Sequence, residues 1–236
     1  MFADMHNHFV YGVDDGCKTK EIMEQLLTAL HEDGVTRLVS TAHITPGQRH
    51  FPMEEYLSHF GEAKAFIQDR QWDLSIYTGH EILYTDAAPR YLREKKALTL
   101  ADSEFVLIEF MPNEKYERLK EAAQKIRNAG YHPVFAHIER YDAMNDLKHV
   151  REMKHDYGVR IQVNCHTFTA RQPFLRRRWL GRLIREELLD YVSTDTHDMP
   201  GREPCMSACF QTLEQEFGRE AARALTWYDA QEFLEG

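Results

Sequence analysis

The chain has 236 residues, of which 43% are hydrophobic and 28% charged, and its formal net charge is −9. This balance is typical of a globular protein with a sizeable core, and the negative charge argues against a nucleic-acid partner. No apolar run approaches the roughly 18 residues of a membrane span, and the opening MFADMHNHF lacks a secretory signal, so we expect a cytoplasmic protein with reduced cysteines.

Short apolar runs alternate with helical segments along the chain. The first run, residues 2–6, precedes Ile22, Leu26 and Leu30, which share one face of a helix. The expected strands are residues 2–6, 36–41, 74–78, 105–109, 133–136, 159–163 and 191–193. Helical stripes separate most of these strands, and a basic helix is expected near residues 174–189.

Strands separated by helices of about ten or more residues indicate a mainly parallel α/β sheet. The sequence contains no linker or internal repeat, so we expect residues 1–236 to form a single domain. About seven strand–helix units in one domain predict an irregular barrel. A doubly wound open sheet is the alternative.

Nearly every expected strand ends in, or is followed by, an imidazole or a carboxylate. These residues are His6, His8, His43, Glu81, Glu109, His137, Asp195 and His197. The carboxyl ends of parallel strands open onto one face, where active sites of such folds lie. Residues two apart on an extended segment point the same way, so both imidazoles of the first pair can reach one ion. Asp14 and Asp15 lie on the first loop over the same mouth.

A single histidine at a strand end is usually structural, but the joint pattern is different. Buried polar groups at successive strand ends are costly unless they are paired or bind a metal. Imidazole and carboxylate together suit manganese, iron or zinc better than calcium. The sequence therefore predicts a metal site at the mouth, and it leaves the roles of His80 and His166, which lie near the mouth, open.

A family resemblance is carried by the stretches DMHNHFVYGVDDG, STAH, GHEI, LIEF, AHIERY and STDTHDMPGR. In order and spacing they resemble the PHP (polymerase and histidinol phosphatase) superfamily, and most of all its bacterial protein-tyrosine phosphatases of capsule and exopolysaccharide synthesis. The resemblance covers essentially the whole chain. This sequence departs from the family at His80 in GHEI, and at Cys165 and His166 in QVNCHTF, where small residues are usual.

The resemblance implies a distorted (β/α)7 barrel with three divalent metal ions, most readily manganese, with iron, zinc or magnesium as options. The first ion would be held by His6, His8 and Asp195 with Glu81 as a bridge, the second by Glu81, Glu109 and His137, and the third by Asp15, His43 and His197. Three divalent ions and four carboxylates would leave the site at about +2, so an acidic chain could bind a phosphate dianion there.

The resemblance also implies the reaction and the partner. A hydroxide generated by the clustered metals would attack the phosphorus of a phosphotyrosine, while Arg140 and Arg202 clamp the phosphate oxygens with their guanidinium forks. The implied partner is a tyrosine-phosphorylated protein, namely the C-terminal tail of a membrane-associated bacterial tyrosine kinase.

Other functions stay open at this point. Cys165 and Arg171 match the Cys-x5-Arg signature of cysteine-dependent tyrosine phosphatases, although HTFTA between them has no glycine for a tight phosphate loop. A histidinol-phosphatase-like phosphoesterase would use the same metals, since fold does not fix function. A non-catalytic binding protein is a third option, against which the full ligand set argues. The basic stretch 171–185 is expected to be a solvated helix face, with docking of an acidic peptide or of the kinase as the alternative.

Overall fold

The computed structural model describes residues 1–48, 50–197, 203–228, 230 and 234. Its strands are β1 (Phe2–Asn7), β2 (Val35–Ser40), β3 (Ala42–Ile44), β4 (Ser75–Tyr77), β5 (His80–Leu83), β6 (Phe105–Glu109), β7 (His132–Phe135), β8 (Arg160–Asn164) and β9 (Tyr191–Ser193). Its α-helices are α1 (Lys20–Glu32), α2 (Met53–Asp69), α3 (Ala88–Arg93), α4 (Tyr116–Asn128), α5 (Leu147–His155), α6 (Cys165–Thr169), α7 (Phe174–Arg185), α8 (Met206–Phe217) and α9 (Arg219–Arg223). The predicted alternation of strands and helices is confirmed.

Every strand pair among the described residues is parallel, in the orders β1-β2-β4 and β3-β5-β6-β7-β8-β9. Only Thr41 separates β2 from β3, and residues 78–79 separate β4 from β5, so each pair is one strand broken in two. Hydrogen bonds carry the ladder across the breaks. The amide of Thr41 donates to the Asn7 carbonyl (2.8 Å), and the amide of Glu81 donates to the Thr41 carbonyl (3.1 Å).

The first and last strands meet, so the sheet closes. Asn7 and Thr196 form a parallel bridge beyond the end of β9, and the amides of His8 and Asp195 donate to the carbonyls of Thr196 and His6, each at 2.9 Å. With the broken strands counted once, the ring has seven strand positions. The distorted (β/α)7 barrel is therefore confirmed, and the open-sheet alternative is wrong.

The two strand breaks, which the sequence analysis did not foresee, surround one buried tyrosine. The hydroxyl of Tyr56 on α2 donates to the Gly79 carbonyl (3.2 Å) and accepts from the Gly79 amide (3.4 Å). A side chain at position 79 would meet Val39 and the Ser40 carbonyl at 3.2 and 3.3 Å. In place of the expected strands 36–41 and 74–78, the structure has two interrupted strands, β2 followed by β3 and β4 followed by β5.

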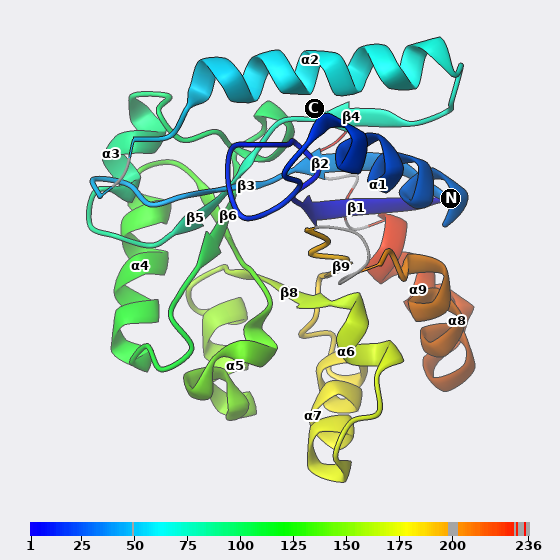
Figure 1. Cartoon of the computed structure of the whole chain (residues 1–236). Coiled ribbons are helices and arrows are strands. Elements are labelled where there is room, and N and C mark those ends of the chain that lie inside the picture. The colour runs from blue at the N-terminus through cyan, green and yellow to red at the C-terminus, as the bar shows by residue number, and fades with distance from the viewer. Residues whose placement is uncertain (49, 198–202, 229, 231–233, 235–236) are drawn as a thin grey trace.

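Side chains alternate between the inside of the barrel and the helix layer. On β6, Val106 and Ile108 pack in the large core under the helices, whereas Leu107 belongs to a small inner cluster with Met5 and Val134. Figure 1 shows the helices surrounding the curled sheet, with α2 above it, α7 below, and α8 and α9 to the right. Among the described helices, none is long and apolar enough to span a membrane.

Candidate metal centre

His6 and His8 reach the barrel mouth because β1 changes face along its length. Met5 belongs to the inner apolar cluster, so strict alternation would turn His6 outward. The pairing register of β1 with β2 shifts between Asp4 and Asn7, and such an irregularity re-aims the side chains that follow it. Both imidazoles are buried, and their Nε2 atoms lie 3.2 Å apart.

Glu81 occupies the centre of the cluster and is fully buried. Its Oε2 atom lies 3.0 Å from His6 Nε2 and 3.2 Å from His8 Nε2. The same oxygen is 3.2 Å from His43 Nδ1, and Oε1 is 2.8 Å from His137 Nε2. Burial acts to raise the pKa of Glu81, but the imidazole charges outweigh it and hold that pKa well below its usual value. Oε2 has no hydrogen-bond partner among the described residues, as expected of an oxygen that binds a cation.

Two further carboxylates face this centre. Asp195 Oδ1 lies 3.4 Å from His6 Nε2, while its Oδ2 accepts from Asn164 Nδ2 at 2.7 Å. Glu109 Oε1 lies 3.5 Å from His137 Nε2. Burial, and then the charge of Glu81, raise the pKa of Glu109 to about 8. The crowding of like charges would be relieved by bound cations.

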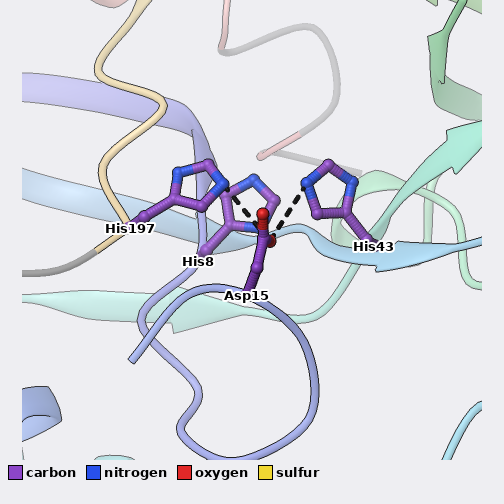
Figure 2. A group of neighbouring side chains, drawn as sticks. All are labelled: His8, Asp15, His43 and His197. Atoms are coloured by element: carbon purple, nitrogen blue, oxygen red, sulfur yellow. Dashed lines mark ion pairs between the residues drawn. The ribbon is translucent and has the colours of Figure 1, made fainter. Parts of the chain in front are cut away.

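A third group lies nearer the surface and is shown in Figure 2. Asp15 Oδ1 lies 3.4 Å from His43 Nε2 and 3.5 Å from His197 Nε2. His8 completes the group, and one ligand atom from each of the four residues lies within 4.8 Å of the others. Asp15 is 69% exposed, so this group is open to solvent while Glu81 is not.

Asp14 orients the first loop and two of the imidazoles. Its Oδ2 accepts from His8 Nδ1 and from the His43 amide, both at 2.9 Å, and its Oδ1 accepts from the Gly16 amide at 2.9 Å. Burial acts to raise the pKa of Asp14, but the hydrogen bond and charge of His8 lower it to about 2. A side chain at Gly16 would lie 2.4 Å from the His8 carbonyl. The DDG stretch is therefore a loop folded tightly against His8.

The other imidazoles are oriented in the same way. His6 Nδ1 lies 3.4 Å from Gln162 Oε1, and His197 Nδ1 lies 3.0 Å from the backbone carbonyl of Asp195. A metal-binding imidazole usually donates its second nitrogen to such an acceptor, which leaves the first nitrogen free to ligate. The sequence analysis placed Asp14 at the mouth without a role and missed Gln162, since a lone glutamine in an apolar strand carries no distinct signal.

Backbone strain marks two of the candidate ligands. His137 has φ 31° and Asp195 has φ 52°, in the left-handed region that residues other than glycine rarely adopt. The His137 amide donates to Gln162 Oε1 at 2.5 Å, and the Asp195 amide donates to the His6 carbonyl. Such strain costs about 1–3 kcal/mol per residue and clusters at functional sites.

The structure thus brings all the predicted ligands to one place. Three groups could each hold an ion, namely His6, His8, Glu81 and Asp195; His43, Glu81 and Glu109; and His8, Asp15, His43 and His197. These groups differ in detail from those that the family resemblance implies. His43 belongs to both the second and the third group, and His8 belongs to both the first and the third. His137 contacts both carboxylates of the second group.

Arg140 lies on the rim of the cluster. Its Nη2 is 2.5 Å from Asp195 Oδ2, and the side chain is 38% exposed, so it contacts both the buried centre and solvent. Arg202 lies outside the described residues.

The two histidines left open do not join the centre. His80 packs between the rings of Phe51 and Tyr56, at centroid distances of 4.4 and 5.4 Å, and its Nδ1 accepts from the Leu98 amide at 3.0 Å. Burial lowers the pKa of His80 to about 3, so this ring is neutral and structural. His166 is exposed on α6.

The cysteine alternative does not fit the structure. Cys165 is fully buried, and its Sγ lies 3.6 Å from Met206 Sδ. Burial, followed by hydrogen bonding with Cys205, raises the pKa of the Cys165 thiol well above its usual value, whereas a nucleophilic cysteine needs a lowered pKa. Arg171 is exposed. The Cys-x5-Arg match is therefore a coincidence of spacing.

A closed parallel barrel with imidazoles and carboxylates gathered at its mouth places the protein among the PHP and amidohydrolase-like barrels. A solved structure described as YwqE from Bacillus subtilis and CpsB from Streptococcus pneumoniae, unique metal-dependent tyrosine phosphatases, superposes with a TM-score of 0.88 at 21% identity, covering 99% of this chain and 94% of that one. Histidinol phosphate phosphatase from Lactococcus lactis superposes with a TM-score of 0.58 at 11% identity, covering 94% of both chains. These likenesses show the shared fold.

Sequence comparison is more specific. The family model described as capsular polysaccharide synthesis, CpsB/CapC, matches residues 2–235. The chain is 33% identical over 229 residues to tyrosine-protein phosphatase CpsB of Streptococcus pneumoniae, covering 94% of this chain and 93% of that protein. It is 22% identical to tyrosine-protein phosphatase YwqE of Bacillus subtilis, covering 94% and 88%. The protein belongs to the CpsB/CapC family, and the predicted resemblance is confirmed.

Proposed function

We propose that this protein is a metal-dependent protein-tyrosine phosphatase, a phosphoric monoester hydrolase of capsular polysaccharide synthesis. One observation carries the proposal within a CpsB/CapC chain. The buried Oε2 of Glu81 lies 3.0–3.2 Å from nitrogens of His6, His8 and His43, at the mouth of a phosphoesterase-type barrel. Such convergence of ligand atoms suits divalent cations that carry a phosphate.

We further propose three divalent ions, most readily manganese, with iron, zinc or magnesium as options. The residues that would hold them are His6, His8, Asp15, His43, Glu81, Glu109, His137, Asp195 and His197. When bound, the ions supply a lowered pKa for a coordinated water and charge neutralisation for the phosphate. The ligand types and the crowded carboxylates support this assignment.

Arg140 is the proposed phosphate clamp. Its guanidinium sits at the junction of the buried cluster and solvent, held by Asp195 Oδ2, and a planar fork of donors matches phosphate oxygens. Arg202 is proposed to act with it on the strength of the family resemblance alone. Both would bind phosphate without occupying a metal ligand position.

A cavity beside the ligands suits the aromatic part of the substrate. It has a volume of about 550 Å³ and opens next to His43 and Glu109. Ile44, Phe51 and Leu83 form part of its apolar wall. A phosphotyrosine presents a charged end and an aromatic ring, so the phosphate would face the ligands while the ring packs against this wall.

The proposed physiological substrate is the C-terminal tail of a membrane-associated bacterial tyrosine kinase. The burial of Glu81 supports an extended substrate, since a phosphotyrosine on a flexible tail enters a deep mouth more readily than one on a folded surface. The relatives CpsB of Streptococcus pneumoniae and YwqE of Bacillus subtilis are tyrosine-protein phosphatases.

The test compares two substrates. The manganese-loaded protein should hydrolyse a phosphotyrosine peptide much faster than histidinol phosphate, the substrate that the alternative function predicts. Glu81→Gln should abolish hydrolysis of the peptide, because it removes the central ligand charge. Glu94→Gln is the matched control, since Glu94 pairs with Lys96 at the surface. A preference for histidinol phosphate, or full activity of Glu81→Gln, would overturn the proposal.

A further inference from the structure

A basic groove lies between the α6–α7 segment and α8, and none of the candidate metal ligands lines it. It has a volume of about 650 Å³ and is lined by Arg171, Arg177, Arg178 and Arg185, with Glu216 as its carboxylate. In Figure 1, α7 lies below the sheet and next to α6. Guanidinium groups thus gather on a protein whose net charge is −9.

The arginines of the groove fall into two kinds. Arg177 Nη2 pairs with Glu216 Oε1 at 3.1 Å, and the Arg185 guanidinium lies 5.3 Å from the ring centroid of Phe217. Arg171 and Arg178 are exposed, and neither forms an ion pair or side-chain hydrogen bond within the described part of the chain. Arg171 and Arg178 therefore present guanidinium N–H donors in a concave surface.

Aromatic side chains complete the groove. Phe168, Phe174 and Phe217 line it, and Phe174 is 76% exposed. A large aromatic ring left this exposed next to guanidinium groups is a feature of binding surfaces rather than of a solvated helix face.

The groove starts close to the metal centre. Asn164, which donates to Asp195 Oδ2, also donates its amide to Glu139 Oε1 at 3.0 Å. Thr167 of the groove donates its hydroxyl to the same Glu139 oxygen at 3.1 Å. Asn164 is the last residue of β8, and Thr167 lies three residues further along the chain on α6. Glu139 therefore links the rim of the groove to a residue that contacts Asp195.

We propose that the basic groove is a docking site for an acidic segment of the phosphorylated protein whose phosphotyrosine lies at the metal centre. This inference rests on the proposed function. Arginine forks bind carboxylates or further phosphates, and the aromatic rings would cover the peptide between them. A concave groove favours a peptide over a membrane surface, which would need a flat or convex face.

The test uses peptides with the same phosphotyrosine core, extended either by acidic residues or by neutral polar residues. Each kind of extension is placed in one peptide at the N-terminal side of the core and in another at the C-terminal side. Wild type should show a lower KM for an acidic peptide. The double variant Arg171→Glu, Arg178→Glu should raise that KM by roughly tenfold at low salt, less at high salt, and leave kcat unchanged. Arg93→Glu is the control, because Arg93 is exposed at the end of α3 and does not line the groove, and α3 lies away from α7 in Figure 1.

Turnover of a small aryl phosphate should be equal in wild type and all variants, and this readout separates the two proposals. If no phosphotyrosine substrate is hydrolysed, the proposed function fails. If the peptides are hydrolysed but wild type shows no acidic preference, or Arg93→Glu matches the double variant, the docking site is wrong. Loss of binding to anionic vesicles with unchanged peptide KM would likewise overturn it in favour of a membrane-binding patch.

Discussion

Replacing Asp14 by asparagine should weaken metal binding without removing a ligand. Asp14 accepts three hydrogen bonds, from His8 Nδ1, the His43 amide and the Gly16 amide. Asparagine has one acceptor oxygen, so its amino group must face one of these donors. His8 also loses the negative charge that favours its orientation. Loss of such an outer carboxylate typically lowers metal affinity by about 10–100-fold, which is about 1.4–2.8 kcal/mol.

The assay is a manganese titration of the metal-stripped protein, followed both by equilibrium dialysis and by turnover of an aryl phosphate. The midpoint for Asp14→Asn should rise by about 10–100-fold, with turnover at saturating manganese close to that of wild type. Asp86→Asn makes the same chemical change at an exposed ion pair with Arg118 and should leave the midpoint unchanged. An unchanged midpoint for Asp14→Asn would refute the orienting role. A large loss of turnover at full metal loading would instead assign Asp14 to the chemistry.

Three further outcomes are expected. Chelation should abolish hydrolysis of an aryl phosphate and lower the Tm, because ions bind the folded state, and manganese should restore both; a verified metal-free preparation with full turnover would contradict this. Arg140→Ala should lower kcat/KM on the order of 10²–10³-fold at unchanged metal content, and Arg140→Lys should recover part of it; a parallel fall in metal content would show that Arg140 acts through Asp195. Cys165→Ser should keep most of the turnover, because the thiol is buried; a loss of several orders of magnitude in the folded, metal-loaded protein would revive the thiol mechanism.

The order of elements was predictable because apolar runs and helical stripes are local features. Residues 105–109 were expected as a strand and form β6 with the same bounds. The strand breaks were not predictable from local pattern, since they depend on a tertiary contact. The Tyr56 hydroxyl reaches Gly79 from the preceding helix, α2, and nothing in the spacing of Tyr56 distinguishes it from an ordinary core residue.

The site was predictable as a set of residues but not in its geometry. Parallel strands bring their carboxyl ends together, so the strand-end imidazoles and carboxylates had to meet. The register shift in β1 and the left-handed backbone at His137 and Asp195 decide where those groups point. Both features depend on pairing between distant segments. The sequence also could not reveal that Asp14 orients His8, because this contact depends on how the first loop folds against β1.

The barrel interior holds both apolar and charged side chains, and this combination links stability to function. Part of the interior is filled by apolar side chains such as Met5 and Leu107. The rest includes His6, Glu81 and Asp195, all of which are buried. Buried charged groups stabilise a fold only when their charges are balanced. Burial and the charge of Glu81 raise the pKa of Glu109, so the other side chains of the site do not balance its negative charge. The residues that would bind the ions therefore replace a layer of hydrophobic core, and metal binding would restore the stability that this layer gives up.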